Sequence, residues 1–457
     1  MALKQNAAVA ALQKAGEVIE TSLCEVQGAW LALVQTAEGK RLAYAAQGET
    51  ALGKLWKEIE KSEDVDGVHV DVMKLNANNA AALRRFVKWT APSACGTKGT
   101  SVGFSDWLGE ADAVVTELFA KRQLKPVLVD FTPEDSAALG RNFLEAVDAA
   151  TWGVLEAGYK NGYGANAAGL KSNDDIVKAL LYGYSMIGLD CSDKIDLGIE
   201  KLSDEAVDKR FEQFPDAFRA AMHASYLNAE FKVGASKITF TENQLHRIVL
   251  EYGEAIMYIQ SIYIDYLKNT PWDIDFELSL SKPGKVLTPE EHYLIANELQ
   301  RNGIKLSAIC LDPLKDAEAL AENLQIHCEI ADTFGYRLSF ENADIAMPNT
   351  AAAVKFLKGK VNFKMNNILW MSAVKLVKAL DAALFAKLCA ATGCDVPGGA
   401  VCGRMESGRA LALGYQKVLN PKVEGNVAAE MKAFLEAHHA EYKAEILQNV
   451  GAHLKNI

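Results

Sequence analysis

The sequence of 457 residues lacks the features that mark a membrane or nucleic-acid partner. It has no apolar run near the roughly 18 residues that a membrane span needs, and its N-terminus has no unbroken apolar stretch typical of a signal peptide. Its 48 Lys and Arg residues are outnumbered by 59 Asp and Glu residues, so the net charge is −11 and phosphate-backbone binding is disfavoured. We therefore expect a cytoplasmic protein with no membrane and no nucleic-acid partner.

Paired cysteines and nucleotide-binding glycine motifs are also missing. The eight cysteines occur singly, without a CxxC pair, which predicts reduced, buried thiols and disfavours a disulfide framework or a cysteine zinc site. The glycine-rich segment 393–408 lacks the spacing of a phosphate-binding loop. Its backbone amides beside Arg404 and Arg409 are compatible with anion binding, but the pattern favours a turn.

What the chain does contain is an ordinary globular composition arranged in a regular rhythm. Half of the residues are hydrophobic, 23% are charged, and the mean hydropathy is −0.01. Between residues 100 and 366, short apolar runs alternate with helix-like segments, which predicts an α/β fold of the (β/α)8 barrel type. The eight predicted strands are Thr100–Phe104, Val127–Phe131, Tyr163–Leu170, Met186–Asp190, Ile274–Leu280, Ile304–Leu311, Tyr336–Glu341 and Val361–Lys364.

Three regions follow from this pattern. Residues 1–94 are predicted to form an N-terminal helix plus a small α/β unit. This unit has a hairpin of strands over 29–35 and 41–46, a strand over 68–75, and helices over 49–61 and 79–88. Residues 95–395 form the barrel, with an insertion at 195–272 that contains helices over 203–227 and 242–267 and a hairpin over 231–240. Residues 396–457 form a C-terminal helical extension.

A barrel places its functional groups at the carboxyl ends of the strands. Reading those ends gives a charged mouth that suits a small anionic ligand such as a sugar acid or sugar phosphate. The residues at these ends are Asp106, Asp130, Lys171, Asp190, Lys282, Asp312, Glu341, Lys364 and Asn366. For any one of them, the alternative interpretation is that the charged side chain only contacts solvent at the rim of the barrel and binds no ligand.

Two kinds of strand-end chemistry can be weighed from the residue types alone. None of the eight histidines falls at a predicted strand end, so a zinc site there is disfavoured. An all-oxygen site from Asp130, Asp190 and Glu341 would favour Mg²⁺ or Mn²⁺. Lys171 and Lys364 occupy positions from which a lysine could act as a Schiff-base nucleophile or bind an anion.

Several stretches resemble the tagaturonate/fructuronate epimerases, and together they span roughly residues 95–390. The similar stretches are Ala150–Gly158, Gly162–Lys171, Leu189–Asp193, Leu250–Ala255, Thr288–His292 and Asn362–Lys364. The resemblance implies a metal-dependent barrel that inverts one hydroxyl-bearing carbon of a six-carbon keto-uronate. That carbon is not adjacent to the ketone, so a retro-aldol cleavage followed by re-addition is one route, and it needs acid/base groups and a cation at the carbonyl oxygen.

The resemblance also assigns candidate site residues. Those that keep the family pattern are Glu156, Lys171, Asp190, Glu277 and Lys364. From these and the strand ends we predict Lys171, Asp190, Glu277 and Lys364 as catalytic residues. We predict Glu156, Asp130, Lys282, Glu341 and Asn366 as substrate-binding residues.

The family's histidines and one acidic segment have no counterpart here. The family pattern has an Asp-His pair before the third-strand lysine, where this chain has Ala168-Gly169. Its final His-x-Lys-Thr becomes Asn362-Phe363-Lys364-Met365, and Ser279 to Gly284 replaces its acidic segment after Glu277. We therefore predict no protein metal ligands, and an absent or weak divalent metal as cofactor.

Three functional hypotheses remain open at this point. The first is an enzyme that acts on a sugar acid or keto-sugar by epimerase, isomerase or aldol-type chemistry, with native epimerase activity in doubt. The second is an inactive relative that binds a sugar acid or partners a true epimerase. The third is a structural protein, and a homo-oligomer is compatible with all three.

Overall fold

The computed structural model describes residues 3–280, 282–313, 317–344, 352–391, 418–455 and 457. The glycine-rich segment 393–408 therefore lies outside the described residues. Contacts divide the chain into two units, each built from separate segments. Unit 1 contains residues 1–93, 105–165 and 368–451, and unit 2 contains residues 94–104, 166–367 and 452–457.

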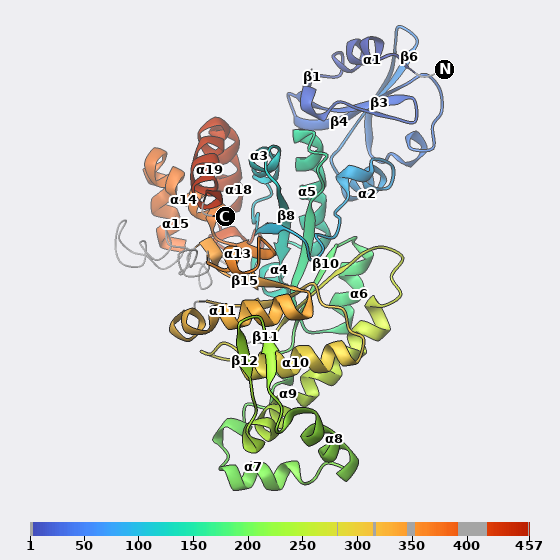
Figure 1. Cartoon of the computed structure of the whole chain (residues 1–457). Helices are drawn as coiled ribbons and strands as arrows, with labels where there is room; N and C mark the ends of the chain where they lie inside the picture. The colour runs from blue at the N-terminus through green and yellow to red at the C-terminus, as the bar shows by residue number, and fades with distance from the viewer. Residues whose placement is uncertain (1–2, 281, 314–316, 345–351, 392–417, 456) are drawn as a thin grey trace. The chain divides into compact units, whose positions relative to one another are not determined.

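Eight strands close into a barrel, which confirms the predicted fold class. Three of them, β8, β10 and β15, are labelled in Figure 1. Around the ring they follow the order β10, β13, β14, β15, β16, β7, β8, β9, and the ladder from β9 through β10 and β13–β16 to β7 is parallel. The strands are β7 (Thr100–Phe104), β8 (Leu124–Phe131), β9 (Gly164–Leu170), β10 (Met186–Asp190), β13 (Asp275–Ser279), β14 (Ala308–Leu311), β15 (Arg337–Phe340) and β16 (Val361–Met365).

The strand β9 has the least typical sequence, Gly-Ala-Asn-Ala-Ala-Gly-Leu, and its neighbour explains it. A Cβ atom on Gly188 of β10 would lie 3.1 Å from the Ala168 Cα, so the two backbones approach closely here. Small residues permit that approach, and the pairing also shifts register between Ile187 and Leu189. The close pairing with β10 thus stabilises β9 as a strand although it lacks the β-branched residues that usually favour one.

Helices follow most of the barrel strands, as the alternating pattern predicts. They begin with good caps: Thr132 and Thr288 each form a reciprocal capping box with the acidic residue three positions on. These helices are α3 (Asp112–Phe119), α4 (Pro133–Leu139), α5 (Phe143–Ala157), α6 (Asn173–Leu181), α10 (Pro289–Arg301), α11 (Ala317–Phe334), α13 (Ala352–Phe356) and α14 (Ile368–Leu380).

The N-terminal part of unit 1 is an antiparallel sheet with an apolar core on each face. Its path is β1-β3-β4-β6-β5, and β2 pairs with β3. The strands are β1 (Glu17–Val18), β2 (Cys24–Val26), β3 (Ala29–Thr36), β4 (Gly39–Ala46), β5 (Ile59–Val65) and β6 (Val68–Met73). Helix α1 (Gln5–Leu12) supplies Ala8, Ala11 and Leu12 to one core, and α2 (Ala77–Phe86) supplies Ala82 and Leu83 to the other.

The predicted helix over 49–61 is wrong. The structure has a short 3-10 turn at Gly53–Leu55 and then the edge strand β5, which pairs with β6. The charged residues from Glu60 to Asp64 resemble the exposed face of a helix, but in the structure they lie on a largely exposed edge strand. Charged residues on an edge strand discourage pairing with other chains.

The two helices predicted in the insertion, over 203–227 and 242–267, differ in detail from the structure. The insertion contains α7 (Asp204–Phe211) and α8 (Asp216–Tyr226), because Pro215 removes a backbone donor between them. It continues as the hairpin β11 (Phe231–Val233) and β12 (Ser236–Ile238), and then as α9 (Glu242–Ile262), which ends in a π-helical turn at Tyr263–Leu267. Near the C-terminus lie α15 (Ala382–Ala391), α18 (Ala428–Ala437) and α19 (His439–Leu454). No helix of the described chain combines the length and hydropathy that crossing a membrane requires.

Candidate active site in the barrel

The central feature of the barrel interior is an ion pair between Glu277 of β13 and Lys364 of β16. The Lys364 Nζ lies 2.5 Å from the Glu277 Oε1, and both side chains are 2% exposed. Two strands, β14 and β15, separate β13 from β16 in the ring. The two side chains therefore meet inside the barrel, and both residues were predicted to be catalytic.

The two carboxylate oxygens of Glu277 have different surroundings. Among the described residues, the Glu277 Oε2 is buried and has no hydrogen-bond partner. A buried, unsatisfied acceptor is costly, and in native proteins it marks a position that needs an explanation, such as a bound ligand or a reacting group. Glu277 thus combines a cationic partner on one oxygen with a vacant acceptor on the other.

Glu341, which follows β15, brings a second carboxylate toward Lys364. Its Oε1 lies 3.9 Å from the Lys364 Nζ and accepts a 3.6 Å hydrogen bond from the Cys310 Sγ. Burial raises the pKa of the Cys310 thiol well above its ordinary value. Cys310 is therefore a neutral donor at this point, and it does not carry thiolate chemistry.

Beside this pair lies a layer of buried polar side chains that the sequence analysis missed. The Arg337 Nη1 donates to the Ser101 Oγ at 2.7 Å, and the Ser101 Oγ donates to the Asn362 Oδ1 at 2.8 Å. The Asn362 Nδ2 then donates to the Ser339 Oγ at 2.8 Å. Arg337 is fully buried at the start of β15, and periodicity gave no signal for its role. This network fixes the interior around β7, β15 and β16.

The other two predicted catalytic residues, Lys171 and Asp190, lie together at the ends of β9 and β10. The Lys171 Nζ is 3.6 Å from the Asp190 Oδ2 and 2.8 Å from the Asp193 Oδ1. Asp190 also accepts a 2.8 Å bond from the backbone N–H of Ser192, which holds its carboxylate in place. The Lys171 side chain is 37% exposed, so its ammonium is accessible to a ligand.

The predicted substrate-binding residues have varied surroundings. Asp130 is buried on β8, and the Asn366 Oδ1 is buried with no hydrogen-bond partner among the described residues. Lys282 is 7% exposed and ion-paired with Glu251 at 3.0 Å and Glu291 at 2.7 Å. Its charge is therefore neutralised inside the protein. The roles assigned to all of these residues remain predictions.

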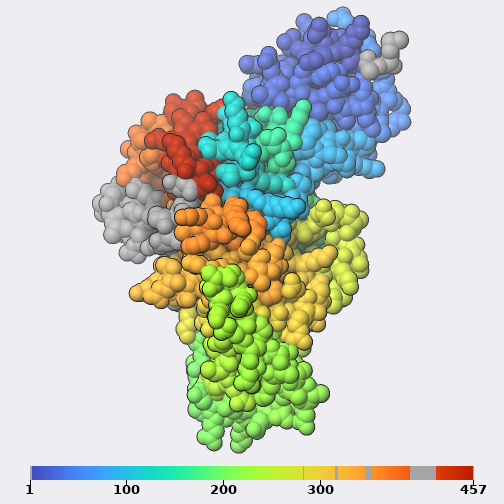
Figure 2. Space-filling model, in the orientation of Figure 1, coloured from blue at the N-terminus to red at the C-terminus, as the bar shows by residue number. Residues whose placement is uncertain are grey.

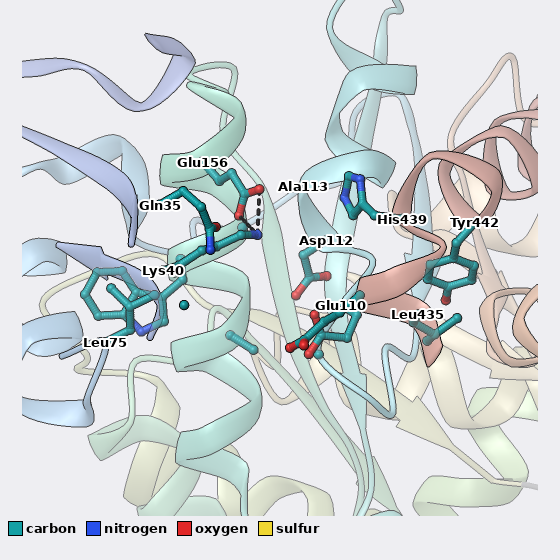
Figure 3. Close-up of a pocket in the computed structure, with 16 residues that line it drawn as sticks. Gln35, Lys40, Leu75, Glu110, Asp112, Ala113, Glu156, Leu435, His439 and Tyr442 are labelled. Atoms are coloured by element: carbon teal, nitrogen blue, oxygen red, sulfur yellow. Dashed lines mark hydrogen bonds and ion pairs between the residues drawn. The ribbon is translucent and has the colours of Figure 1, made fainter. Parts of the chain in front are cut away.

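Glu156 lies on helix α5, where it lines a cavity of about 650 Å³ within unit 1 (Figure 3). Its two carboxylate oxygens each accept a 2.7 Å bond from the Lys40 Nζ. Glu110, Asp112 and Glu436 line the same cavity. Burial, helped by the charge of Asp106, raises the pKa of Glu110 to about 7. The Glu156 carboxylate is thus already paired with a cation, and its role in substrate binding stays a prediction.

The residues at the strand ends do not fit a tightly held metal. In the described part of the chain, the group of three His, Cys, Asp or Glu ligand atoms within 4.8 Å of one another is His223, Glu242 and His246, and it lies in the insertion. In the barrel, the cation beside Glu277 and Glu341 is the Lys364 ammonium. The barrel donors therefore provide an amine where a metal-dependent site would gather imidazoles and carboxylates.

Comparisons with known proteins agree with one another. A family model described as tagaturonate epimerase matches residues 19–396. A tagaturonate/fructuronate epimerase of Thermotoga maritima is 27% identical over 383 residues, which is 81% of this chain and 78% of that protein. A glycerol-complexed crystal structure of fructuronate-tagaturonate epimerase from Cohnella laeviribosi has a TM-score of 0.87 and 26% identity, covering 98% of both chains. The native crystal structure of the same protein has a TM-score of 0.86 and 26% identity, covering 98% of this chain and 99% of that one.

Proposed function

Because the chain belongs to the tagaturonate epimerase family, we propose that it is an enzyme that epimerises a six-carbon keto-uronate or a close relative inside its barrel. The observation that carries the proposal is the Glu277–Lys364 pair, in which one carboxylate oxygen is held by the ammonium and the other has no hydrogen-bond partner among the described residues. This pair supplies a base and an electrophile side by side, which is what an aldol-type reaction needs.

The proposed reaction inverts the carbon β to the ketone without direct deprotonation of that carbon. The Glu277 Oε2 accepts the proton of the β-hydroxyl group, and the bond between the α and β carbons breaks to give an aldehyde and an enolate. The Lys364 ammonium stabilises the enolate oxygen. The aldehyde then turns its other face to the enolate, the carbon–carbon bond forms again, and Glu277 returns the proton.

A lysine could instead form a Schiff base, and the structure favours the ammonium role. Schiff-base formation needs a neutral amine, whereas a carboxylate at 2.5 Å stabilises the protonated form of Lys364. Lys171 is the better candidate for binding the substrate carboxylate. It is accessible, and an anionic ligand would replace Asp193, whose side chain is 67% exposed.

A binding protein without turnover is the second candidate function. The side chains of the barrel favour it. The resemblance implies a metal-dependent reaction, but the described barrel residues present no cluster of three metal ligands. In this case Glu277 and Lys364 would hold a sugar acid by hydrogen bonds and charge alone.

The test is interconversion of tagaturonate and fructuronate by the purified full chain, followed by NMR. We expect turnover after chelator treatment, and a loss of at least about 100-fold in kcat for Glu277→Gln and Lys364→Met. Lys375→Met is a matched control, because Lys375 forms a 2.5 Å pair with Glu445 but is 60% exposed. Its kcat should equal that of the unmodified protein.

Absence of turnover, with and without added Mg²⁺, Mn²⁺, Ni²⁺ or Zn²⁺, would overturn the enzymatic proposal. Calorimetry with the same two uronates then tests the second candidate. Binding that Lys364→Met weakens and Lys375→Met leaves unchanged would support it, and no binding would reject it.

A further inference from the structure

The insertion carries a cluster of two histidines and one glutamate at the junction of α8 and α9, helices that are labelled in Figure 1. His223 lies near the end of α8, while Glu242 and His246 lie in the first two turns of α9. Glu242 and His246 are four residues apart and so share one helix face. Figure 2 shows the insertion in green with much of its surface open to solvent. The cluster plays no part in the barrel chemistry proposed above.

The three side chains converge on one point. The His223 Nε2 is 2.8 Å from the His246 Nε2 and 3.9 Å from the Glu242 Oε1. The ring centroids of the two histidines are 5.1 Å apart and their planes differ by 21°, so the rings meet edge to edge through their Nε2 atoms. All three potential ligand atoms lie within 4.8 Å of one another.

Asp208 of α7 fixes the tautomer of His246. The Asp208 Oδ1 lies 2.7 Å from the His246 Nδ1, and it also accepts a 3.1 Å bond from the Asn243 Nδ2. A carboxylate accepts hydrogen bonds, so the His246 Nδ1 carries the proton and its Nε2 presents a lone pair toward His223. Phe211 stacks on the His246 ring with centroids 3.8 Å apart, which holds the ring in this orientation.

We propose that His223, His246 and Glu242 bind a divalent cation of the zinc type, with Asp208 as the group that orients His246. Two imidazoles and a carboxylate are ligands that Zn²⁺ prefers, and a carboxylate behind a ligating histidine is the usual supporting contact. With three protein ligands, water completes the coordination sphere.

The site needs only a small adjustment to accept the ion. Zn–N distances of about 2.0–2.1 Å in tetrahedral geometry separate two ligand atoms by about 3.3 Å. The two Nε2 atoms must therefore move apart by about half an ångström. His246 is 5% exposed and held by Asp208 and Phe211, so His223 and Glu242, whose side chains are 34% and 64% exposed, supply the movement.

A bound ion would join the end of α8 to the start of α9, and it would reach α7 through Asp208. This has a practical consequence for the barrel. Metal found in the purified protein would not by itself indicate a catalytic metal, because the insertion offers a separate site.

The test is direct metal binding to the chelator-treated full chain. Zn²⁺ is titrated in competition with a chromophoric chelator, and Co²⁺ is titrated while its visible d–d absorption is recorded. We expect one equivalent to bind, at least 100-fold weaker binding for His223→Gln, and about 10- to 100-fold weaker binding for Asp208→Asn. His69→Gln is the matched control, since His69 also lies beside two carboxylates, 3.2 Å from both Asp64 and Asp71, and should leave the affinity unchanged.

No stoichiometric binding to the unmodified chain at micromolar metal would overturn the proposal. So would an affinity that His223→Gln leaves unchanged. Circular dichroism of the metal-free variants confirms that a loss of binding is not a loss of folding. Turnover by metal-free His223→Gln equal to that of the metal-free parent separates this proposal from the barrel chemistry, because the two can then fail independently.

Discussion

Replacing Lys282 with Met should strongly destabilise unit 2. Lys282, Glu251 and Glu291 are 7%, 5% and 7% exposed at their side chains, and the ammonium lies 3.0 Å and 2.7 Å from the two carboxylates. Burial alone would lower the pKa of Lys282, but the carboxylates of Glu291 and Glu251 outweigh it and raise the pKa above its ordinary value. Removing the cation leaves two buried carboxylates close together.

The expected cost is about 3–5 kcal/mol in the free energy of unfolding, as for breaking a buried ion pair from one side. Glu251 lies on α9 and Glu291 on α10, so the substitution should weaken the packing of the insertion on the barrel helices of its own unit. Urea unfolding at pH 7, followed by circular dichroism and tryptophan fluorescence, measures the shift.

Lys285→Met is the matched control. Lys285 pairs with Glu200 at 3.0 Å, but its side chain is 57% exposed, so its removal should cost under about 1 kcal/mol. Neutralising Glu251 and Glu291 to Gln in the Lys282→Met background should recover part of the loss. If Lys282→Met is no more destabilising than Lys285→Met, the inference from burial is refuted.

Three further predictions follow from buried groups and close contacts. Burial lowers the pKa of His327 to about 4, so its contribution to stability is lost as the pH falls from about 6.5 to 4. The difference in unfolding free energy between the parent and His327→Leu should change by about 3 kcal/mol across that range, and a constant difference would contradict this. The raised pKa of Glu110 predicts a pH dependence of the opposite sign, because the buried carboxylate destabilises the folded protein once it must lose its proton. The stability gained by Glu110→Gln should therefore grow as the pH rises from about 4.5 to 7, and a constant gain would contradict this. Gly153→Ala should lower the free energy of unfolding by about 1–3 kcal/mol in thermal unfolding, because the new Cβ would lie 2.7 Å from the Asp112 Cβ. Gly253→Ala is the control, since no atom lies near that position, and it should stabilise the protein by about 0.5–1 kcal/mol. Equal effects of the two substitutions would refute the close-contact argument.

The barrel strands could be predicted from the sequence because short runs with apolar residues alternate with helix-like segments, although β9 is rich in small residues and β13 and β16 carry polar ones. Strands buried on both faces have this pattern, and β7 and β10 begin and end at the predicted residues. The errors occur where the tertiary context overrides local pattern. The charged segment of β5 looks helical until its pairing with β6 is known, and Pro215 divides a pattern that is periodic on both sides.

The sequence identified individual candidate residues of the site, but it could not show which of them form ion pairs. Glu277 and Lys364 are 87 positions apart in the sequence, and only closure of the ring brings their charges together. The partners of Lys282 lie on two different helices, so the sequence could not distinguish a rim lysine from a buried one. The histidine cluster did leave a signal: Glu242 and His246 have the spacing of one helix face, and His223 precedes them on the neighbouring helix.

We propose that Glu277 and Lys364 invert a β-carbon by breaking and remaking a carbon–carbon bond. The most direct test is the conversion of tagaturonate to fructuronate in D₂O, with the inverted carbon observed by NMR. We expect a product that keeps its original hydrogen on that carbon, because the carbon passes through an aldehyde and never loses its C–H bond. Deuterium at the inverted carbon, or an undiminished rate in Glu277→Gln, would contradict it.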